Sequence, residues 1–336
     1  MRKPVDLLGV LLALMMTADA YAQPAVDTTT PRIAINQEAT DTATRLELLQ
    51  HELYAQQQEV MFLTLLRQYD DRMLIRRTLF PSGPELVPAY IFSPQPLDRG
   101  HSYPGLVIVH GGFHGRLEWR FFDLIDHAVR SGYVVIFPEY RGSAGYGDVH
   151  YQNGYGTTDV ADVLASVDYL VKSTPHVDAK RIGIFGHSRG GLVTLLAIEK
   201  QPRKFKAAVD VAGLADMVAF MAYKPDFRRQ ATAAEPQFGG KLPSENLAPY
   251  MEISPLNYVD AIETPLFVAA TTGDEVVPMP LHTGRLIDAL KARNKTFEVK
   301  IYDQAPGDHV FLFGDTDERR DLFERMFGFL ARYLQP

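Results

Sequence analysis

The chain has 336 residues, of which 46% are hydrophobic and 22% are charged, and it contains no cysteine. This length and composition are those of an ordinary globular protein with a sizeable core, and the lack of thiols excludes disulfides, thiolate catalysis and Cys-ligated zinc. The formal net charge is −7 and the sequence has no basic run, so we expect no nucleic-acid partner.

The amino-terminal residues follow the pattern of a secretory signal peptide. Arg2 and Lys3 precede the apolar run LLGVLLALMM, and an A-x-A cleavage pattern ends at Ala22. We therefore expect residues 1–22 to be removed, leaving a secreted or periplasmic protein with no stable membrane insertion. An uncleaved anchor helix is the alternative, although this apolar run is short for a membrane span.

Residues 23–72 are expected to precede the main domain. The stretch 23–40 is rich in Thr, Pro, Ala and Asp, as flexible leaders are, whereas 46–69 carries apolar residues at helical spacing and predicts an N-terminal helix. Two antiparallel strands, 73–80 and 86–92, are expected to follow around a Pro-containing turn.

From residue 105 onward, predicted strands alternate with predicted helices. Strands are expected at 105–110, 133–137, 181–185, 207–212, 265–271 and 297–303, and helices at 117–130, 158–171, 190–199, 281–292 and 317–334. This alternation predicts an α/β fold with one mainly parallel sheet and helices on both faces. The pattern breaks at about 214–259, which predicts a short cap insertion within one domain spanning 73–336.

One serine lies between a predicted buried strand and a predicted helix. The stretch RIGIFGHSRGG contains GHSRG, which fits G-x-S-x-G with Ser188 at its centre. In this motif a serine on a tight strand-to-helix turn projects its Oγ above the sheet, while the flanking glycines relieve crowding. Ser188 is therefore our candidate nucleophile.

A serine nucleophile needs a base within hydrogen-bond reach and a third group that orients the base. In the α/β-hydrolase arrangement the chain order is nucleophile, acid, histidine, each at the carboxyl end of a strand. His282 and His309 are the histidines that follow Ser188 and the strand at 265–271. His282 falls at the start of a predicted helix, whereas His309 lies in a loop after a strand, so we predict His309 as the base.

The acid is expected after the strand at 265–271, where TTGDEVVP offers Asp274 and Glu275. We predict Asp274, because the shorter carboxylate directly follows Gly273 in a tight turn, and Glu275 is the alternative.

The oxyanion formed on attack needs preorganised N–H donors. We predict the backbone amide of Arg189, which follows the nucleophile, and those of Gly111 and Gly112 in the loop HGGFHG after the strand at 105–110. The alternative is that this loop is an ordinary Gly-rich turn.

Taken in order, the stretches HGGFHG, PEYRGSAGYG, FGHSRGG, SPLNYVDAIETPLFVAATTGDEVVP and APGDHVF resemble the catalytic domain of the prolyl oligopeptidase family of serine peptidases. The resemblance covers about residues 75–334, and it implies Ser188, Asp274 and His309 as the triad. This chain departs from the family by the pair Thr271–Thr272 before the acid and by Asp308 before the histidine. Residues 23–72 are too few for the β-propeller that such peptidases usually carry.

The resemblance implies hydrolysis of amide bonds in short peptides through an acyl-serine, without a metal or other cofactor. A carboxylesterase using the same triad and a silent binding protein are the alternatives. We expect substrate contacts from Tyr140, in the loop EYRGSAGYG, and from Phe220 and Tyr223 of the insertion, although aromatic residues there are more often the insertion's own core. The oligomeric state does not follow from the sequence.

Overall fold

The computed structural model describes residues 42–98, 100–152 and 154–336, so the predicted signal peptide and leader lie outside the described residues. The chain divides into two compact units, residues 1–57 and 58–336. The described part of the first unit is helical and belongs to α3 (Thr42–Tyr69). The second unit holds the sheet and the candidate site, and the domain limits inferred from the sequence stay predictions.

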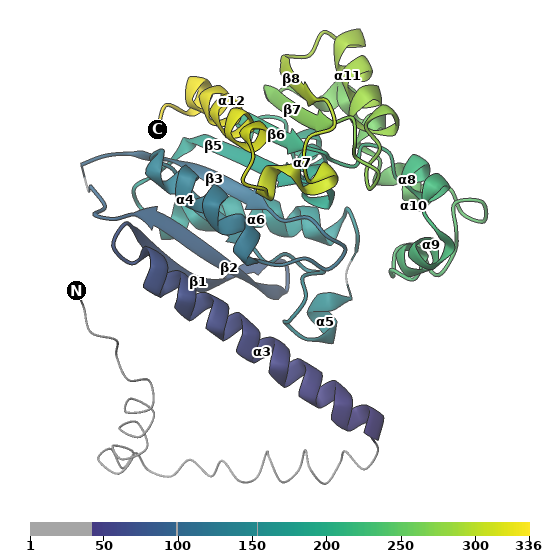
Figure 1. The fold of residues 1–336 in the computed structure, drawn as a ribbon, viewed down its shortest axis with the longest axis horizontal. Helices are drawn as coiled ribbons and strands as arrows, with labels where there is room; N and C mark the ends of the chain where they lie inside the picture. The colour runs from purple at the N-terminus through teal and green to yellow at the C-terminus, as the bar shows by residue number, and fades with distance from the viewer. Residues whose placement is uncertain (1–41, 99, 153) are drawn as a thin grey trace. The chain divides into compact units, whose positions relative to one another are not determined.

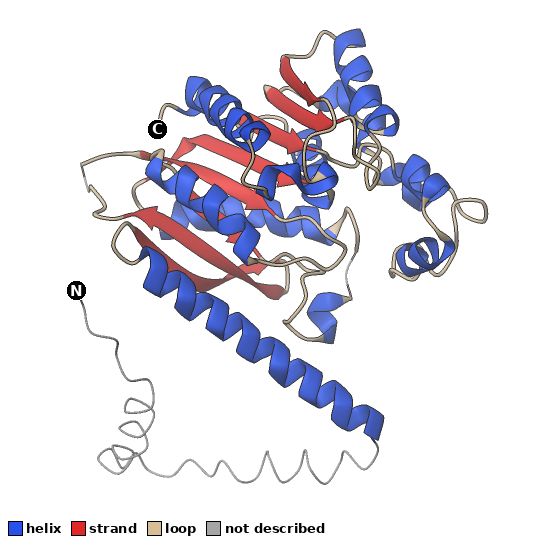
Figure 2. Cartoon of the chain, in the orientation of Figure 1, coloured by secondary structure: helices blue, strands red, loops and turns tan. Residues whose placement is uncertain are grey.

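The second unit is built on an eight-stranded sheet with the order β1-β2-β4-β3-β5-β6-β7-β8. Its strands are β1 (Met73–Ser82), β2 (Glu85–Pro94), β3 (Tyr103–Val109), β4 (Val134–Pro138), β5 (Val177–His187), β6 (Ala207–Val211), β7 (Leu266–Thr271) and β8 (Phe297–Tyr302). β1 and β2 are antiparallel to their neighbours, and every pairing from β4 to β8 is parallel (Figure 2). The predicted mainly parallel sheet is confirmed.

Helices cover both faces of this sheet, because its central strands bury their side chains on both sides. α4 (Phe122–Arg130) and α12 (Asp317–Leu334) lie on one face, with α6 (Thr158–Ser173) and α7 (Arg189–Lys200) on the other (Figure 1). Leu106 and Phe185 belong to the core that α4 and α12 cover, whereas Val107 and Ile184 belong to the core that α6 and α7 cover. This alternation is the period of two that a β-strand imposes.

The remaining elements are short and lie mostly at the carboxyl ends of the strands. The insertion after β6 contains α8 (Met217–Tyr223), α9 (Asp226–Ala233) and α10 (Ala248–Glu252), followed by η2 (Pro255–Asn257) and η3 (Val259–Ala261). The others are η1 (Trp119–Phe121), α5 (Asp148–Tyr151), η4 (Met279–Leu281), α11 (Thr283–Ala292) and η5 (Asp308–Phe313). The helices predicted at 117–130 and 281–292 are thus each split into a short 3₁₀ turn and an α-helix.

Candidate active site

Ser188 occupies the sharp turn between β5 and α7, in a backbone conformation rare for a residue with a side chain. Its φ is 60° and its ψ is −122°. The turn closes only because glycines surround it: a Cβ on Gly186 would lie 2.0 Å from the carbonyl oxygen of Gly190, and one on Gly190 would lie 2.2 Å from that of Val109. The strained turn holds the hydroxyl above the sheet.

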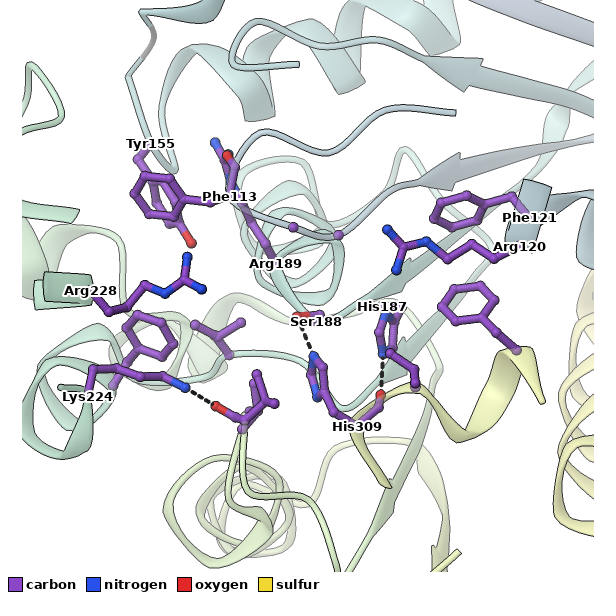
Figure 3. A pocket seen from close by; sticks show the side chains of 18 residues that line it. Phe113, Arg120, Phe121, Tyr155, His187, Ser188, Arg189, Lys224, Arg228 and His309 are labelled. Carbon is purple, nitrogen blue, oxygen red and sulfur yellow. Dashed lines mark hydrogen bonds between the residues drawn. The ribbon is translucent and has the colours of Figure 1, made fainter. Parts of the chain in front are cut away.

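His309 joins Ser188 to Asp274 in a continuous hydrogen-bonded relay. Its Nε2 lies 2.8 Å from Ser188 Oγ (Figure 3). Its Nδ1 lies 2.7 Å from Asp274 Oδ2. Asp274 follows β7 and His309 lies in η5 after β8, so the parallel sheet brings three distant segments to one edge. The structure therefore joins the three residues predicted as the triad, whose catalytic role stays a prediction.

The contacts of Asp274 decide where the protons lie. The amides of Val276 and Val277 donate to its Oδ1 at 2.9 and 2.7 Å, and its side chain is fully buried. A carboxylate only accepts hydrogen bonds, so His309 carries its proton on Nδ1 and its Nε2 accepts from the Ser188 hydroxyl. Glu275, the alternative acid, points into solvent.

His187 makes a hydrogen bond to the backbone of the loop that carries His309. Its Nε2 lies 2.7 Å from the carbonyl oxygen of His309, which can only accept, so Nε2 is the protonated nitrogen. Burial, together with the nearby His309, lowers the pKa of His187 to about 3, so the ring is neutral and acts as a fixed donor. The sequence offered no signal for this role beyond the neighbouring position.

Thr271 and Thr272, the departure from the family pattern, join the acid turn to the histidine loop. The amide of Ala305 donates to Thr271 Oγ1 at 2.8 Å. Thr272 Oγ1 accepts from the amide of Gln304 at 2.9 Å and donates to Asp303 at 2.8 Å. These hydrogen bonds fix the two loops relative to each other.

The glycine loop after β3 passes directly against the nucleophile turn. A Cβ on Gly111 would lie 2.6 Å from the carbonyl oxygen of His187 and 3.1 Å from Ser188 Cβ, and Gly112 has a φ of 88°. Both conditions require glycine. Gly111, Gly112 and Arg189, predicted to form the oxyanion hole, line the same cavity as Ser188.

The buried side chain of Arg189 ties this loop to the rest of the site. One end of its guanidinium donates to the carbonyl oxygen of Phe113, and Nη2 lies 3.0 Å from Asp159 Oδ2. Its guanidinium carbon lies 3.9 Å from the centre of the Tyr155 ring. The residue that follows Ser188 therefore also fixes the glycine loop opposite it.

The prediction that Tyr140 contacts substrate is wrong, because its side chain is fully buried and does not line the cavity. Its ring stacks on His110 with the centroids 4.1 Å apart, and its hydroxyl donates to the His110 carbonyl oxygen at 2.8 Å. Just after β4 the chain turns this residue inward, beneath the glycine loop.

Glu139 and His110 form a neutral pair in the same buried layer. The amide of Leu117 donates to Glu139 Oε1 at 2.8 Å. Burial raises the pKa of Glu139 to about 8 and lowers that of His110 to about 3, so their 3.8 Å contact is not an ion pair at neutral pH. The folded protein therefore keeps a proton on Glu139 that the unfolded chain releases near pH 4.5. The resulting stabilisation is complete below that pH and is lost as the pH rises toward about 8.

A cavity of about 200 Å³ opens beside Ser188. Its wall is mostly apolar with several cations, and it is formed by Gly111, Gly112, Phe113, Arg120, Phe121, Tyr155, His187, Ser188, Arg189, Leu214, Phe220, Lys224, Arg228, Val276, Val277, His309, Val310 and Phe313 (Figure 3). The predicted contribution of Phe220 agrees with this lining. The cations Lys224 and Arg228 were not predicted.

Tyr223 does not line the cavity, which corrects the prediction that it contacts substrate. Its hydroxyl donates to the Val276 carbonyl oxygen at 3.1 Å and accepts from His282 Nε2 at 3.0 Å. Nδ1 of the buried His282 then accepts from the amide of Ala215 at 3.3 Å, and burial lowers the pKa of His282 to about 4. Tyr223 and His282 therefore brace the insertion against the acid loop.

The other aromatic residues of the insertion also stand apart from the cavity wall. Phe238 stacks on Tyr250 with the centroids 4.1 Å apart, which is the insertion's own small core, and Phe227 is 71% exposed. Among residues 42–98, 100–152 and 154–336, no group of three or more His, Cys, Asp or Glu side chains has a metal-binding arrangement. None of the helices in these ranges is long and apolar enough to cross a membrane.

A serine at a tight turn after β5, an acid after β7 and a histidine after β8 of this sheet define an α/β-hydrolase. Residues 119–336 match the family model of the prolyl oligopeptidase family, and the chain belongs to this family.

Among the relatives, this chain is 30% identical over 223 residues to the uncharacterized peptidase YuxL of Bacillus subtilis (strain 168), covering 66% of this chain and 33% of that protein. It is 30% identical over 220 residues to the acylamino-acid-releasing enzyme of Arabidopsis thaliana, covering 63% of this chain and 28% of the relative. The chain thus spans about a third of the length of these curated relatives. The acylaminoacyl peptidase of Pyrococcus horikoshii superimposes with a TM-score of 0.69 at 23% identity, over 81% of this chain and 43% of that one, and shows the same fold.

Proposed function

We propose that this protein is a serine peptidase that cleaves amide bonds of short peptides through an acyl-serine intermediate, in the manner of prolyl oligopeptidase. The observation that carries the proposal is the relay from Ser188 through His309 to Asp274, with contacts of 2.8 and 2.7 Å, at the edge of an apolar cavity. The membership of the prolyl oligopeptidase family supports a peptidase.

In the proposed reaction, Ser188 Oγ attacks the scissile carbonyl carbon while His309 Nε2 takes the hydroxyl proton. The developing oxyanion accepts hydrogen bonds from the amides of Arg189 and of the glycine loop, and Asp274 stabilises the imidazolium. The tetrahedral intermediate then expels the amine, which receives the proton from His309. Water, deprotonated by His309, attacks the acyl-enzyme, and the second tetrahedral intermediate releases the acid as His309 returns the proton to Ser188 Oγ. No cofactor takes part in any step.

A carboxylesterase with the same three residues is the second candidate. The observation in its favour is the size of the cavity: about 200 Å³, which suits a short acyl group better than an extended peptide. Both candidates share the acyl-serine, and they differ only in the leaving group.

Two measurements test the proposal. A fluorophosphonate probe should label the protein stoichiometrically, and the labelling should vanish in Ser188→Ala; labelling that persists in this variant places the nucleophile elsewhere. The same protein is then assayed, with and without EDTA, on aminoacyl anilides, blocked short peptides and p-nitrophenyl esters. Turnover of esters with every amide left intact replaces the peptidase by the esterase, and loss of activity with EDTA overturns the cofactor-free mechanism.

We further propose that residues 1–22 are a cleaved signal peptide and that the protein acts in the periplasm or outside the cell, on the strength of the apolar run and cleavage pattern. Amino-terminal sequencing of the exported protein should begin near Gln23. A mature chain that still begins at Met1 in the membrane fraction supports the anchor instead.

A further inference from the structure

We propose that Lys224 and Arg228 make the cavity selective for peptides that carry a carboxylate close to the scissile bond. The inference rests on the proposed function, because it names the substrate class of the same site. It starts from the charge of the cavity wall, which holds four cationic side chains, and of the described residues that line the cavity none is an aspartate or a glutamate.

Two of the four cations are already neutralised. Arg189 lies 3.0 Å from Asp159, and Arg120 forms an ion pair with Glu118. Within the described part of the chain, by contrast, neither Lys224 nor Arg228 has a carboxylate within ion-pair distance. The insertion therefore presents to the cavity two positive charges that make no ion pair within the described residues.

Lys224 is half-buried and keeps hydrogen-bonding capacity. Its Nζ donates to the carbonyl oxygen of Val276 at 2.5 Å and lies 4.9 Å from the centre of the Phe220 ring. An ammonium group has three donors, so two remain for a ligand. Burial and the neighbouring charge of Arg228 lower the pKa of Lys224 against the opposing effect of Asp274, and a bound carboxylate would raise it.

Arg228 comes from α9 and its guanidinium is directed toward the cavity, on the same side as Lys224 and across Ser188 from Arg120 (Figure 3). Its side chain is exposed to solvent. A guanidinium offers planar, paired N–H donors that match a carboxylate in two parallel hydrogen bonds. Because the two cations lie on one wall, a single carboxylate can bind both, whereas a protonated amino terminus there is repelled.

The carboxylate can come from an aspartate or glutamate side chain beside the scissile bond or from a free carboxyl terminus shortly after it. Matched substrates separate these sources: doubly blocked peptides with Glu or Gln on either side of the cleaved bond, and the Gln peptide ending in a carboxylate or in an amide. Ester pairs are added, a p-nitrophenyl ester bearing a terminal carboxylate and its neutral analogue, so that selectivity is measured even if amides are not cleaved.

We expect kcat/KM to be at least about tenfold higher for the carboxylate-bearing member of a pair, as is typical when a charged group gains hydrogen bonds. Arg228→Gln and Lys224→Met should each lower that preference, which is the ratio of kcat/KM between the two members of a pair, severalfold. Lys224→Arg should retain it, because the charge is kept. Arg229→Gln is the matched control, since Arg229 lies on the same helix and is paired with Asp226 at 3.2 Å.

The outcomes separate the two levels of the argument. A preference in the ester pairs without cleavage of any peptide supports the cationic wall and removes the peptidase. Equal rates for charged and neutral members of every pair overturn the role of Lys224 and Arg228 while leaving the peptidase intact. A preference that survives Arg228→Gln and Lys224→Met, or that is lost equally in Arg229→Gln, also overturns it.

Discussion

Replacing Asp274 by asparagine tests the relay at the point where the structure fixes the protons. The amides of Val276 and Val277 donate to Oδ1 of Asp274, so the asparagine oxygen takes that place and its NH₂ group faces His309 Nδ1. An amide NH₂ only donates, which forces the proton of His309 onto Nε2. The histidine then donates to Ser188 and can no longer remove its proton.

The expected loss in kcat is about 10⁴-fold, which is the cost of the wrong tautomer in a serine triad. This factor corresponds to about 5 kcal/mol of transition-state stabilisation. Because the amides of Val276 and Val277 keep their hydrogen bonds to the side chain, the melting temperature should stay within a degree or two of the wild type. Steady-state hydrolysis of the best substrate from the panel, with thermal unfolding measured in parallel, provides the assay.

The control is Glu275→Gln, because this neighbouring carboxylate is exposed to solvent. Its kcat should stay within about twofold of the wild type, as expected for a surface substitution away from the reacting groups. A loss below about 100-fold in Asp274→Asn, or an equal loss in Glu275→Gln, refutes the assignment of the acid and of the tautomer.

Three further predictions concern His282, Gly190 and Glu139. His282→Ala should lower stability by about 1–3 kcal/mol, because it leaves buried donors without an acceptor, and should keep kcat within tenfold of the wild type; a drop of several orders with unchanged unfolding would make His282 a catalytic group. Gly190→Ala should abolish fluorophosphonate labelling, because its Cβ would lie 2.2 Å from the carbonyl oxygen of Val109. As the control, Gly328→Ala in α12 should add about 0.5–1 kcal/mol of stability, because a Cβ there has no atom within 4 Å. In the wild type, the free energy of unfolding should fall by on the order of 4 kcal/mol between about pH 5 and pH 8, and Glu139→Gln should abolish this fall. Denaturant unfolding at several pH values measures it. Parallel pH profiles for the two proteins would contradict the burial of a protonated carboxyl.

Much of the fold could be predicted, because its strands are apolar on both faces and its helices have one apolar side. The strand predicted at 181–185 is the centre of β5, and the helix predicted at 317–334 coincides with α12. The limits were less accurate where backbone pairing continues through polar residues. β5 begins at Val177, since Val177 and Asp178 still pair with β3 across a register shift.

The order of the predicted catalytic groups along the chain was informative, because a parallel sheet places the carboxyl ends of its strands at one edge. That argument selected Ser188, Asp274 and His309, and the structure brings their side chains into contact. Side-chain direction does not follow from such an argument. Tyr140 lies in the right loop and yet turns inward, and Tyr223 bonds to the acid loop instead of facing the cavity.

The cations of the insertion were missed for a related reason. Attention to aromatic residues favoured Phe220 and Tyr223 of α8, although Lys224 directly follows this helix and Arg228 lies in α9. Lys224 and Arg228 are four residues apart, but Lys224 lies outside α9, so helical spacing does not explain why both face the cavity. Whether they meet an acidic partner or an open cavity depends on distant residues such as Val276, which only the folded chain brings near.

Arg189 links three segments around the site, so we expect their local unfolding to be cooperative. Its buried side chain contacts Phe113 and Asp159, and it therefore connects the glycine loop, the beginning of α6 and the turn that carries Ser188. Asp159 in turn accepts from the amide of Gly156 at 3.0 Å. A fluctuation that frees any one of these segments breaks contacts of the others, so their amides should exchange with solvent as one unit. These contacts thus link the turn that carries Ser188 to the loop that is predicted to bind the oxyanion.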